Sequence, residues 1–332
     1  MLKLGERGAE TSRRDGLVTV TLNAALDQTL ECPGFAAGAV NRVAAQTLTA
    51  GGKGINVAAL LAGRAGPVTA AGFLGRDNAG PFEALFRERG IQDRCLRLPG
   101  GSRVNIKVVD RQGPEGPKVT DINLPGLAVP PEALSRLVDE LDALARENRW
   151  FVLAGSVPAG VPEDFYADMV RRLRARGCSV AVDASGAALR HAVAAGPDMI
   201  KPNQHELSEL LGRPLPGARA EVLRAARELQ RSGIGLVVVS LGADGALLVD
   251  AERALLAVPP PIEIASTVGA GDAMVAGVLA ARLREGGDLE ACARLGTAFA
   301  AGKLAEVGPV LPADERIEEL RAATRIERVD LA

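Results

Sequence analysis

Hydrophobic residues in this chain gather in short β-branched runs, separated by longer stretches in which apolar positions recur at helical spacing. Apolar runs bounded by turn residues predict buried strands, here at residues 17–22, 68–73, 151–155, 179–183, 199–201 and 236–240. Residues 134–147 and 220–232 show clean amphipathic spacing with charged outer faces, which is typical of surface helices. Strands that alternate with helices predict an α/β fold, in which helices cover both faces of a mainly parallel sheet.

A second pattern interrupts this alternation in the first half of the chain. Residues 40–49 mix polar and apolar positions at strand spacing, and residues 103–109 and 119–124 form two more short runs. The sequence between the last two is rich in Gly and Pro and predicts a hairpin turn at residues 111–118. We expect these strands to form a small β-layer outside the main sheet, which we interpret as a lid.

The stretch S-T-V-G-A-G-D at residues 266–272 leads into an uninterrupted Ala, Val, Leu and Met run that predicts a helix buried on all sides. Gly269, Ala270 and Gly271 leave room for an anion beside the positive end of that helix. Asp272 has two interpretations. It is the base of a phosphoryl-transfer site, accepting the proton of the attacking hydroxyl, or it is a helix-capping residue.

Polar residues follow several predicted strands. Asn23 and Asp27 come after the first strand, and similar groups lie at residues 155–158, 201–206 and 240–245. Because α/β sheets place their ligands at the carboxyl edge of the strands, these groups are consistent with one crevice. Each group taken alone is also explained as an ordinary turn, and Asn203 with Glu206 as a helix cap and a first-turn acid. The glycines at residues 51–54 bring backbone close to a ligand before another helix, but they match no Walker loop.

Composition narrows the functional classes. The chain has 332 residues, a formal net charge of −2 and a pI near 5.9, so nothing indicates a nucleic-acid surface. No stretch has the length of a membrane span, and the polar residues 1–15 read as a loose extension without a signal peptide, so we expect a cytoplasmic protein. The four cysteines are far apart and only two histidines exist, which argues against zinc, redox and serine-triad chemistry.

Three motifs in order carry a resemblance to the ribokinase/PfkB family of sugar kinases. They are G-G-K-G-I-N-V-A at residues 51–58, N-x-x-E at 203–206 and T-V-G-A-G-D at 267–272. Within the family the chain resembles the branch of 1-phosphofructokinases and tagatose-6-phosphate kinases, over residues 17–323. The resemblance implies a three-layer ribokinase-like fold in a single kinase domain, residues 16–332. Lid strands are expected within residues 29–49 and 101–126.

The resemblance also assigns roles to residues. It implies that Asp272 is the catalytic base and that Gly269, Ala270 and Gly271 form the anion hole. The residues expected to meet the sugar phosphate are Asp27, Gly52, Lys53, Asn56, Arg103, Asn105, Lys107 and Ser156. The residues expected to contact the nucleotide are Lys201, Asn203, Ser240, Gly242, Ala243, Gly245 and Thr267. Glu206 is expected to organise Mg²⁺ indirectly, through water. Ala24 and Val157 depart from the family pattern, and neither removes a reacting group.

The function implied is an ATP- and Mg²⁺-dependent kinase of a ketohexose monophosphate, with fructose 1-phosphate as the first choice. Tagatose 6-phosphate and fructose 6-phosphate are the other choices within the class. Lys53, Arg103 and Lys107 favour a phosphorylated sugar, since three cations suit a dianion. Rival hypotheses are a non-catalytic sensor of sugar phosphate and nucleotide, and a nucleoside or pyridoxal kinase. We expect a homodimer formed through the lid, with no nucleic acid and no membrane as partner.

Overall fold

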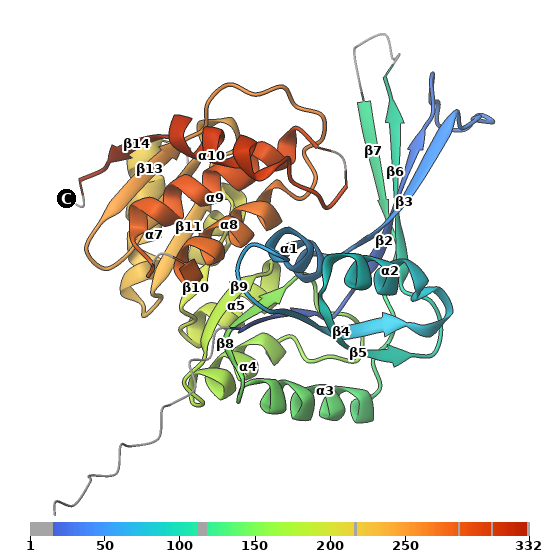
Figure 1. Cartoon of the computed structure of the whole chain (residues 1–332), viewed down its shortest axis with the longest axis horizontal. Coiled ribbons are helices and arrows are strands. Elements are labelled where there is room, and N and C mark those ends of the chain that lie inside the picture. The colour runs from blue at the N-terminus through green and yellow to red at the C-terminus, as the bar shows by residue number, and fades with distance from the viewer. Residues whose placement is uncertain (1–15, 112–117, 216–217, 285, 307, 331–332) are drawn as a thin grey trace, which may run out of the picture.

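A large twisted sheet forms the centre of the molecule (Figure 1). The computed structural model describes residues 16–111, 118–215, 218–284, 286–306 and 308–330. In this described part the sheet has 10 strands, of which seven are parallel to one another: β5 Gln92–Leu98, β4 Val68–Gly75, β1 Gly16–Thr21, β8 Asn148–Ala154, β9 Ser179–Asp183, β10 Met199–Ile200 and β11 Leu236–Ser240. Three antiparallel strands that the sequence patterns did not reveal complete it: β12 Ala246–Val249, β13 Ala254–Val258 and β14 Arg325–Arg328.

Helices cover both faces of this sheet, and a hydrophobic core lies under each layer. Successive strand residues point to opposite faces, so Leu17 belongs to one core and Val18 to the other. One layer consists of α1 Lys53–Leu61, α2 Gly80–Arg89, α8 Ala270–Arg284, α9 Leu289–Leu304 and α10 Asp314–Ala323. The other consists of α3 Pro131–Leu144, α4 Phe165–Arg174, α5 Gly186–Ala194, α6 Gln204–Leu211 and α7 Arg219–Arg231. The predicted three-layer α/β fold is confirmed.

The lid is a four-stranded sheet that projects from the body (Figure 1). Its strand order is β3 Ala45–Gly51, β2 Ala25–Glu31, β6 Arg103–Asp110 and β7 Lys118–Asn123. Strand β2 was not among the strands that the hydrophobic pattern predicted, and the expected lid range of 29–49 includes only its last three residues; the strand expected from residue 40 begins only at Ala45. The side chain of Asn41 explains the late start, because it bonds the backbone of Ala36 and Ala39 and folds this segment into a loop. Most of the predicted hairpin turn lies outside the described residues, as do residues 1–15.

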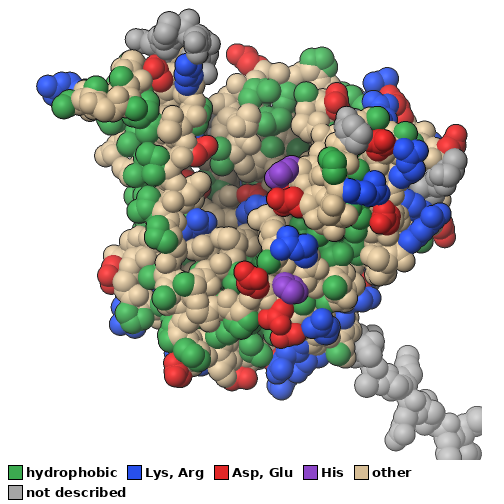
Figure 2. Space-filling model, turned by 180° about the vertical axis from the view of Figure 1, so that it is seen from behind, with side chains coloured by type: hydrophobic (Ala, Val, Ile, Leu, Met, Phe, Trp, Pro, Cys, Tyr) green, Lys and Arg blue, Asp and Glu red, His purple; other side chains and the backbone are tan. Residues whose placement is uncertain are grey.

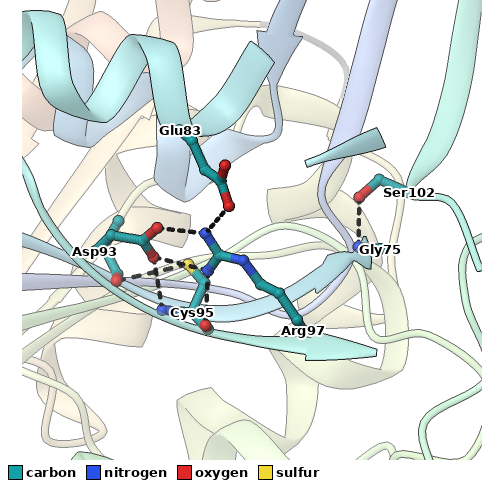
Figure 3. Close-up of polar contacts among 7 residues, drawn as sticks. Gly75, Glu83, Asp93, Cys95, Arg97 and Ser102 are labelled. Atoms are coloured by element: carbon teal, nitrogen blue, oxygen red, sulfur yellow. Dashed lines mark hydrogen bonds and ion pairs between the residues drawn. The ribbon is translucent and has the colours of Figure 1, made fainter. Parts of the chain in front are cut away.

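The root of the lid is fixed to the main sheet just before Arg103 (Figure 3). The backbone N–H of Gly75, at the end of β4, donates to Ser102 Oγ over 2.8 Å. A Cβ at Gly75 would lie 2.1 Å from the Ser102 nitrogen, so a larger residue would push this junction apart. Asn78 forms two more bonds with the backbone of Ser102. The start of β6 therefore has a defined position relative to the sheet.

Edge strand β5 is tied to α2 by a cluster of charged side chains, also drawn in Figure 3. Arg97 pairs with Asp93 on the same strand and with Glu83 on the helix. Burial opposes the ionisation of Asp93, but hydrogen bonds from Arg97 and the Cys95 backbone outweigh it and lower the pKa of Asp93. Burial raises the pKa of the neighbouring Cys95 thiol, so this cysteine stays protonated and inert.

Helix α8 runs through the interior, as the sequence predicted. Every residue from 272 to 281 is buried, and the helix packs closely on α1 and α9. A Cβ on Gly277 would lie 2.5 Å from the carbonyl oxygen of Leu295, so glycine permits this close crossing. Because the helix cannot move without disturbing the core, its N-terminus is held rigidly at the carboxyl edge of the sheet.

Candidate active site

Asp272 lies in the first turn of α8 and is 6% exposed. Its Oδ2 accepts a hydrogen bond of 2.8 Å from Asn56 Nδ2, in the first turns of α1. Burial raises the pKa of Asp272 to about 6, and the nearby negative charge of Asp183 adds to the rise. Asp272 is the third residue of α8, which is not the N-cap position, and its carboxylate faces a side chain of another helix. Asp272 is thus not the N-cap residue of α8, and its role as a base stays a prediction.

Asp183 is a site residue that the sequence reasoning missed. It ends β9 and is 1% exposed, and its Oδ1 lies 3.0 Å from Lys53 Nζ and 3.5 Å from Lys201 Nζ. Burial opposes its ionisation, but the charges of Lys201 and Lys53 outweigh burial and lower the pKa of Asp183. An acid at the end of a wholly apolar run, V-A-V-D, was the available signal.

The two lysines that share Asp183 come from opposite sides of the crevice. Lys53 is the first residue of α1, following Gly52, whose φ of 113° suits glycine. Burial opposes the charge of Lys53, but attraction to Asp183 outweighs it and raises the pKa of Lys53. Lys201 follows β10 and reaches the first turn of α8, where a Cβ on Gly271 would lie 3.1 Å from its Nζ. The predicted residues Lys53, Asn56, Lys201 and Asp272 are therefore brought together.

The lid contributes a second group of polar side chains. Arg103, Asn105 and Lys107 alternate along β6 and so share one face, and Asp27 of β2 lies opposite Asn105. Asn105 Nδ2 donates to Asp27 Oδ1 over 3.0 Å. Burial raises the pKa of Asp27 and lowers that of Arg103. Lys107 pairs with Asp121 of β7, so its predicted contact with the sugar phosphate requires exchange of that partner.

Asn23 connects the lid group to the sheet, a connection that the sequence analysis did not propose. Its Nδ2 donates to Ser156 Oγ over 3.0 Å, and its backbone carbonyl accepts from Arg103 Nη2 over 3.3 Å. A Cβ on Gly126 would lie 1.9 Å from Asn23 Oδ1, so glycine at this position leaves room for the Asn23 side chain. The polar residue after the first strand was visible in the sequence, but its partners lie 80 and 133 positions away.

The residues expected at the nucleotide lie on the strands next to β9. Asn203 and Glu206 form a reciprocal capping box at the start of α6, as their alternative interpretation expected, with both bonds at 2.9 Å. A backbone bridge joins Asn203 to Ser240. Gly242, Ala243 and Gly245 form the turn after β11, and Thr267 lies exposed before the anion hole. These positions put the group at the same carboxyl edge as Asp183, because β9, β10 and β11 are neighbours.

Figure 2 shows the surface indented between the lid and the body, with acidic and basic side chains inside the indentation. No cluster of three or more His, Cys, Asp or Glu side chains that could hold a metal ion occurs in the described part of the chain. Likewise, no described helix is long and apolar enough to cross a membrane.

An acid at the start of a buried helix, with lysines and a glycine loop beside it, has the parts that phosphoryl transfer to a hydroxyl needs. The sequence profile of the pfkB family of carbohydrate kinases matches residues 18–316. The chain belongs to this family. It is therefore a phosphotransferase whose acceptor is an alcohol, and ATP is the co-substrate expected from the family.

Named relatives agree with this assignment. The chain is 49% identical to a 1-phosphofructokinase of Rhodobacter capsulatus, over 94% of this chain and 97% of that protein. It is 40% identical to the 1-phosphofructokinase of Escherichia coli K12, over 87% and 90% of the two chains. Among solved structures, phosphofructokinase-2 of Escherichia coli superposes with a TM-score of 0.83 at 31% identity, covering 92% of this chain and 98% of that one.

Proposed function

We propose that this kinase transfers the γ-phosphoryl group of ATP to the 6-hydroxyl of fructose 1-phosphate, forming fructose 1,6-bisphosphate. The observation that carries the proposal is the buried Asp272 at the start of α8, beside the small residues 269–271 and held by Asn56. Relatives named 1-phosphofructokinase, up to 49% identical over most of the chain, support the choice of substrate.

Asp272 acts as the base. With a pKa raised to about 6, its carboxylate is ionised at neutral pH and is still a better proton acceptor than an ordinary aspartate. It takes the proton of the sugar hydroxyl as the hydroxyl oxygen bonds to the γ-phosphorus and the bond to the ADP oxygen breaks. The backbone N–H groups of Gly269, Ala270 and Gly271 stabilise the charge on the moving phosphoryl group.

The lid holds the sugar phosphate. Arg103 and Lys107 are cations on the face of β6 that Asp27 and Asn105 share, so the first pair suits a phosphate and the second pair suits sugar hydroxyls. Ser156 and Gly52 approach the same ligand from the body. Lys53 approaches the sugar phosphate from the start of α1, where Asp183 fixes its ammonium.

The nucleotide lies along the turn formed by Gly242, Ala243 and Gly245, against Asn203, Ser240 and Thr267. Mg²⁺ fits the acids on this side, because Asp183 Oδ2 is buried without a hydrogen-bond partner among the described residues, and Glu206 in the first turn of α6 is near enough for its charge to act on Lys53. Glu206 and Asp183 would hold it through its water ligands. When bound, the ion neutralises phosphate charge.

The direct test is a coupled assay with purified enzyme, ATP and Mg²⁺ over a panel of acceptors. We expect the largest kcat/KM with fructose 1-phosphate. Fructose 6-phosphate is the second candidate, since phosphofructokinase-2 of Escherichia coli, about 30% identical, has been solved with that ligand. Higher kcat/KM for fructose 6-phosphate, tagatose 6-phosphate or an unphosphorylated substrate would replace the proposed acceptor, and binding without turnover would indicate a sensor.

We further propose a cytoplasmic homodimer formed through the lid. The lid carries exposed hydrophobic side chains at Val43, Leu48, Val119, Ile122 and Leu124, and its outer strands β3 and β7 present edges. Phosphofructokinase-2 of Escherichia coli has a tetrameric inhibited form, so assembly occurs in a relative. Light scattering should give twice the mass of the chain, and Ile122→Lys should give a monomer. A monomeric wild-type protein at micromolar concentration contradicts the proposal.

A further inference from the structure

Lys303 is a buried cation whose role the sequence motifs do not cover. It lies in the last turn of α9 and is 3% exposed. Its Nζ donates to the backbone carbonyl of Glu306 over 2.9 Å, and no carboxylate lies within ion-pair distance among the described residues. Burial lowers the pKa of Lys303, which Glu306 and Asp272 oppose by their charge. A buried lysine without an ion pair is costly, so its position calls for an explanation.

The side chain lies against the anion-hole loop. A Cβ built on Gly269 would lie 3.4 Å from Lys303 Cε and 4.0 Å from Asp272 Oδ2. The lysine stem and the carboxylate therefore approach the same point from different helices. The loop itself is bound to the end of α9, because the N–H groups of Ala265 and Ser266 both donate to the carbonyl of Leu304, at 2.8 and 3.1 Å.

The C-terminal end of α9 places partial negative charge beside the Gly269 loop, and the Lys303 ammonium lies at the same end. The C-terminus of a helix carries partial negative charge, and here the end of α9 supports the loop that is to receive an anion. Without a cation, that negative end would weaken anion binding at Gly269. The ammonium of Lys303 neutralises it and adds positive charge behind the loop.

We propose that Lys303 is a positioning residue of phosphoryl transfer: it holds the Gly269 loop against α9 and makes the anion hole electropositive from behind. The inference rests on the proposed kinase site and assigns to it a residue outside the three motifs. Lys303 acts through the loop on the terminal phosphate of ATP, which the sugar acceptor does not change. The competing explanation is that Lys303 only caps the end of α9.

The test compares Lys303→Met, which keeps the length of the side chain and removes its charge, with Arg294→Met. Arg294 is a matched control, because it lies on the same helix and its Nη1 likewise donates to a backbone carbonyl, that of Thr324. Steady-state kinetics with ATP and fructose 1-phosphate and calorimetric binding of a non-hydrolysable ATP analogue and of ADP are measured for both.

For Lys303→Met we expect kcat to fall about 10- to 100-fold, less than the 10²–10³-fold typical of losing a direct donor. The KM for the sugar phosphate should stay within about twofold, and the ATP analogue should lose about three- to tenfold more affinity than ADP, since the lysine acts on the terminal phosphate through the loop. Arg294→Met should keep kcat within about twofold of the wild type, even if its melting temperature falls as much as that of Lys303→Met. Equal kcat losses in the two variants, or an unchanged ratio of ATP-analogue to ADP affinity, would overturn the proposal.

A second variant covers failure of Lys303→Met to fold. Lys303→Ala leaves space for a small amine, so methylammonium should restore part of kcat while an equal concentration of sodium should not. Absence of rescue in folded Lys303→Ala overturns the proposal. The nucleotide-binding measurements need no sugar acceptor. A wild-type enzyme that rejects fructose 1-phosphate would therefore refute the proposed substrate, while the ratio of ATP-analogue to ADP affinity would still decide the role of Lys303.

Discussion

Replacement of Asp272 by asparagine separates catalysis from stability at the centre of the site. The amide has nearly the same size, and its oxygen can still accept the hydrogen bond from Asn56 Nδ2 that the carboxylate accepts now. It cannot take the proton of the sugar hydroxyl. Loss of a general base costs about 10²–10⁴ in rate, so kcat should fall by that factor while the KM for either substrate changes little.

The same substitution should stabilise the fold, in a pH-dependent way. The pKa of Asp272 is raised from 3.8 to about 6, so ionising it costs the folded state about 3 kcal/mol, at roughly 1.4 kcal/mol per pKa unit. Below the pKa that Asp272 has in the unfolded chain, this cost is absent. It grows as the pH rises toward the pKa of Asp272 in the folded protein, and it is complete above that value. Asp272→Asn should therefore melt several degrees above the wild type at pH 8, and much closer to it near pH 4.5.

Asp288 offers the matched control, because it is a true N-cap whose carboxylate accepts from two backbone N–H groups of α9. These bonds lower the pKa of Asp288, so its ionised carboxylate stabilises the fold at every pH above the pKa that it has in the unfolded chain. Asp288→Asn should therefore show no rise in melting temperature at pH 8. Its kcat should match the wild type. Scanning calorimetry at both pH values and the coupled assay decide the matter. An Asp272→Asn enzyme with more than about a tenth of wild-type kcat, far above the expected range, would refute the base assignment.

Further predictions concern the neighbours of Asp272 and the lid. Asn56→Ala removes a hydrogen bond that lowers the pKa of Asp272, so the acid limb of the kcat–pH profile should move to higher pH. Asp183→Asn removes a negative charge that raises the same pKa, so that limb should move to lower pH; shifts in the same direction would contradict the electrostatic account. Arg103→Ala should raise the KM for the sugar phosphate strongly with the KM for ATP nearly unchanged, because a charged hydrogen bond contributes about 1.5–3 kcal/mol. Chelation of Mg²⁺ should abolish turnover without removing the thermal transition; an enzyme that stays active in excess chelator has no need of the ion.

The sequence predicted those parts of the fold that depend on local pattern. Strands such as β1 and β9 consist mainly of β-branched and apolar residues, and residues 273–281 of α8 are apolar on all sides, so burial could be inferred without knowing the partners. The antiparallel edge formed by β12, β13 and β14 escaped notice, because short strands after a turn carry little periodic signal. Strand β2 was missed for a related reason. It follows β1 after only three residues, and its polar face looked like the end of a turn.

Site residues that lie within one sequence motif could be predicted. Those that depend on pairing with residues far away in the sequence could not. Asp272 and the 269–271 loop lie together in sequence and in space. Asp183 could not be singled out, because its role depends on ion pairs with two distant residues. Lys53 lies 130 residues earlier, and Lys201 follows the next strand. Lys303 was hidden for the same reason: a lysine at the end of a helix is ordinarily a solvated complement to the helix dipole. Only the packing of α9 against the anion-hole loop makes it unusual.

The two buried acids show how one crevice gives identical side chains opposite tasks. Asp183 and Asp272 are both buried, and burial disfavours the charge of both. Asp183 lies within 3.0 and 3.5 Å of two ammonium groups, which hold it ionised and make it a fixed counter-charge. Among the described residues, Asp272 has only a neutral amide as its hydrogen-bond donor, and that bond lowers its pKa less than burial and the charge of Asp183 raise it. Burial raises the pKa of Asp272 most, and the residue that pairs with the lysines raises it further. In the proposed mechanism, a group whose pKa lies near neutrality can both accept the sugar proton and release it after turnover.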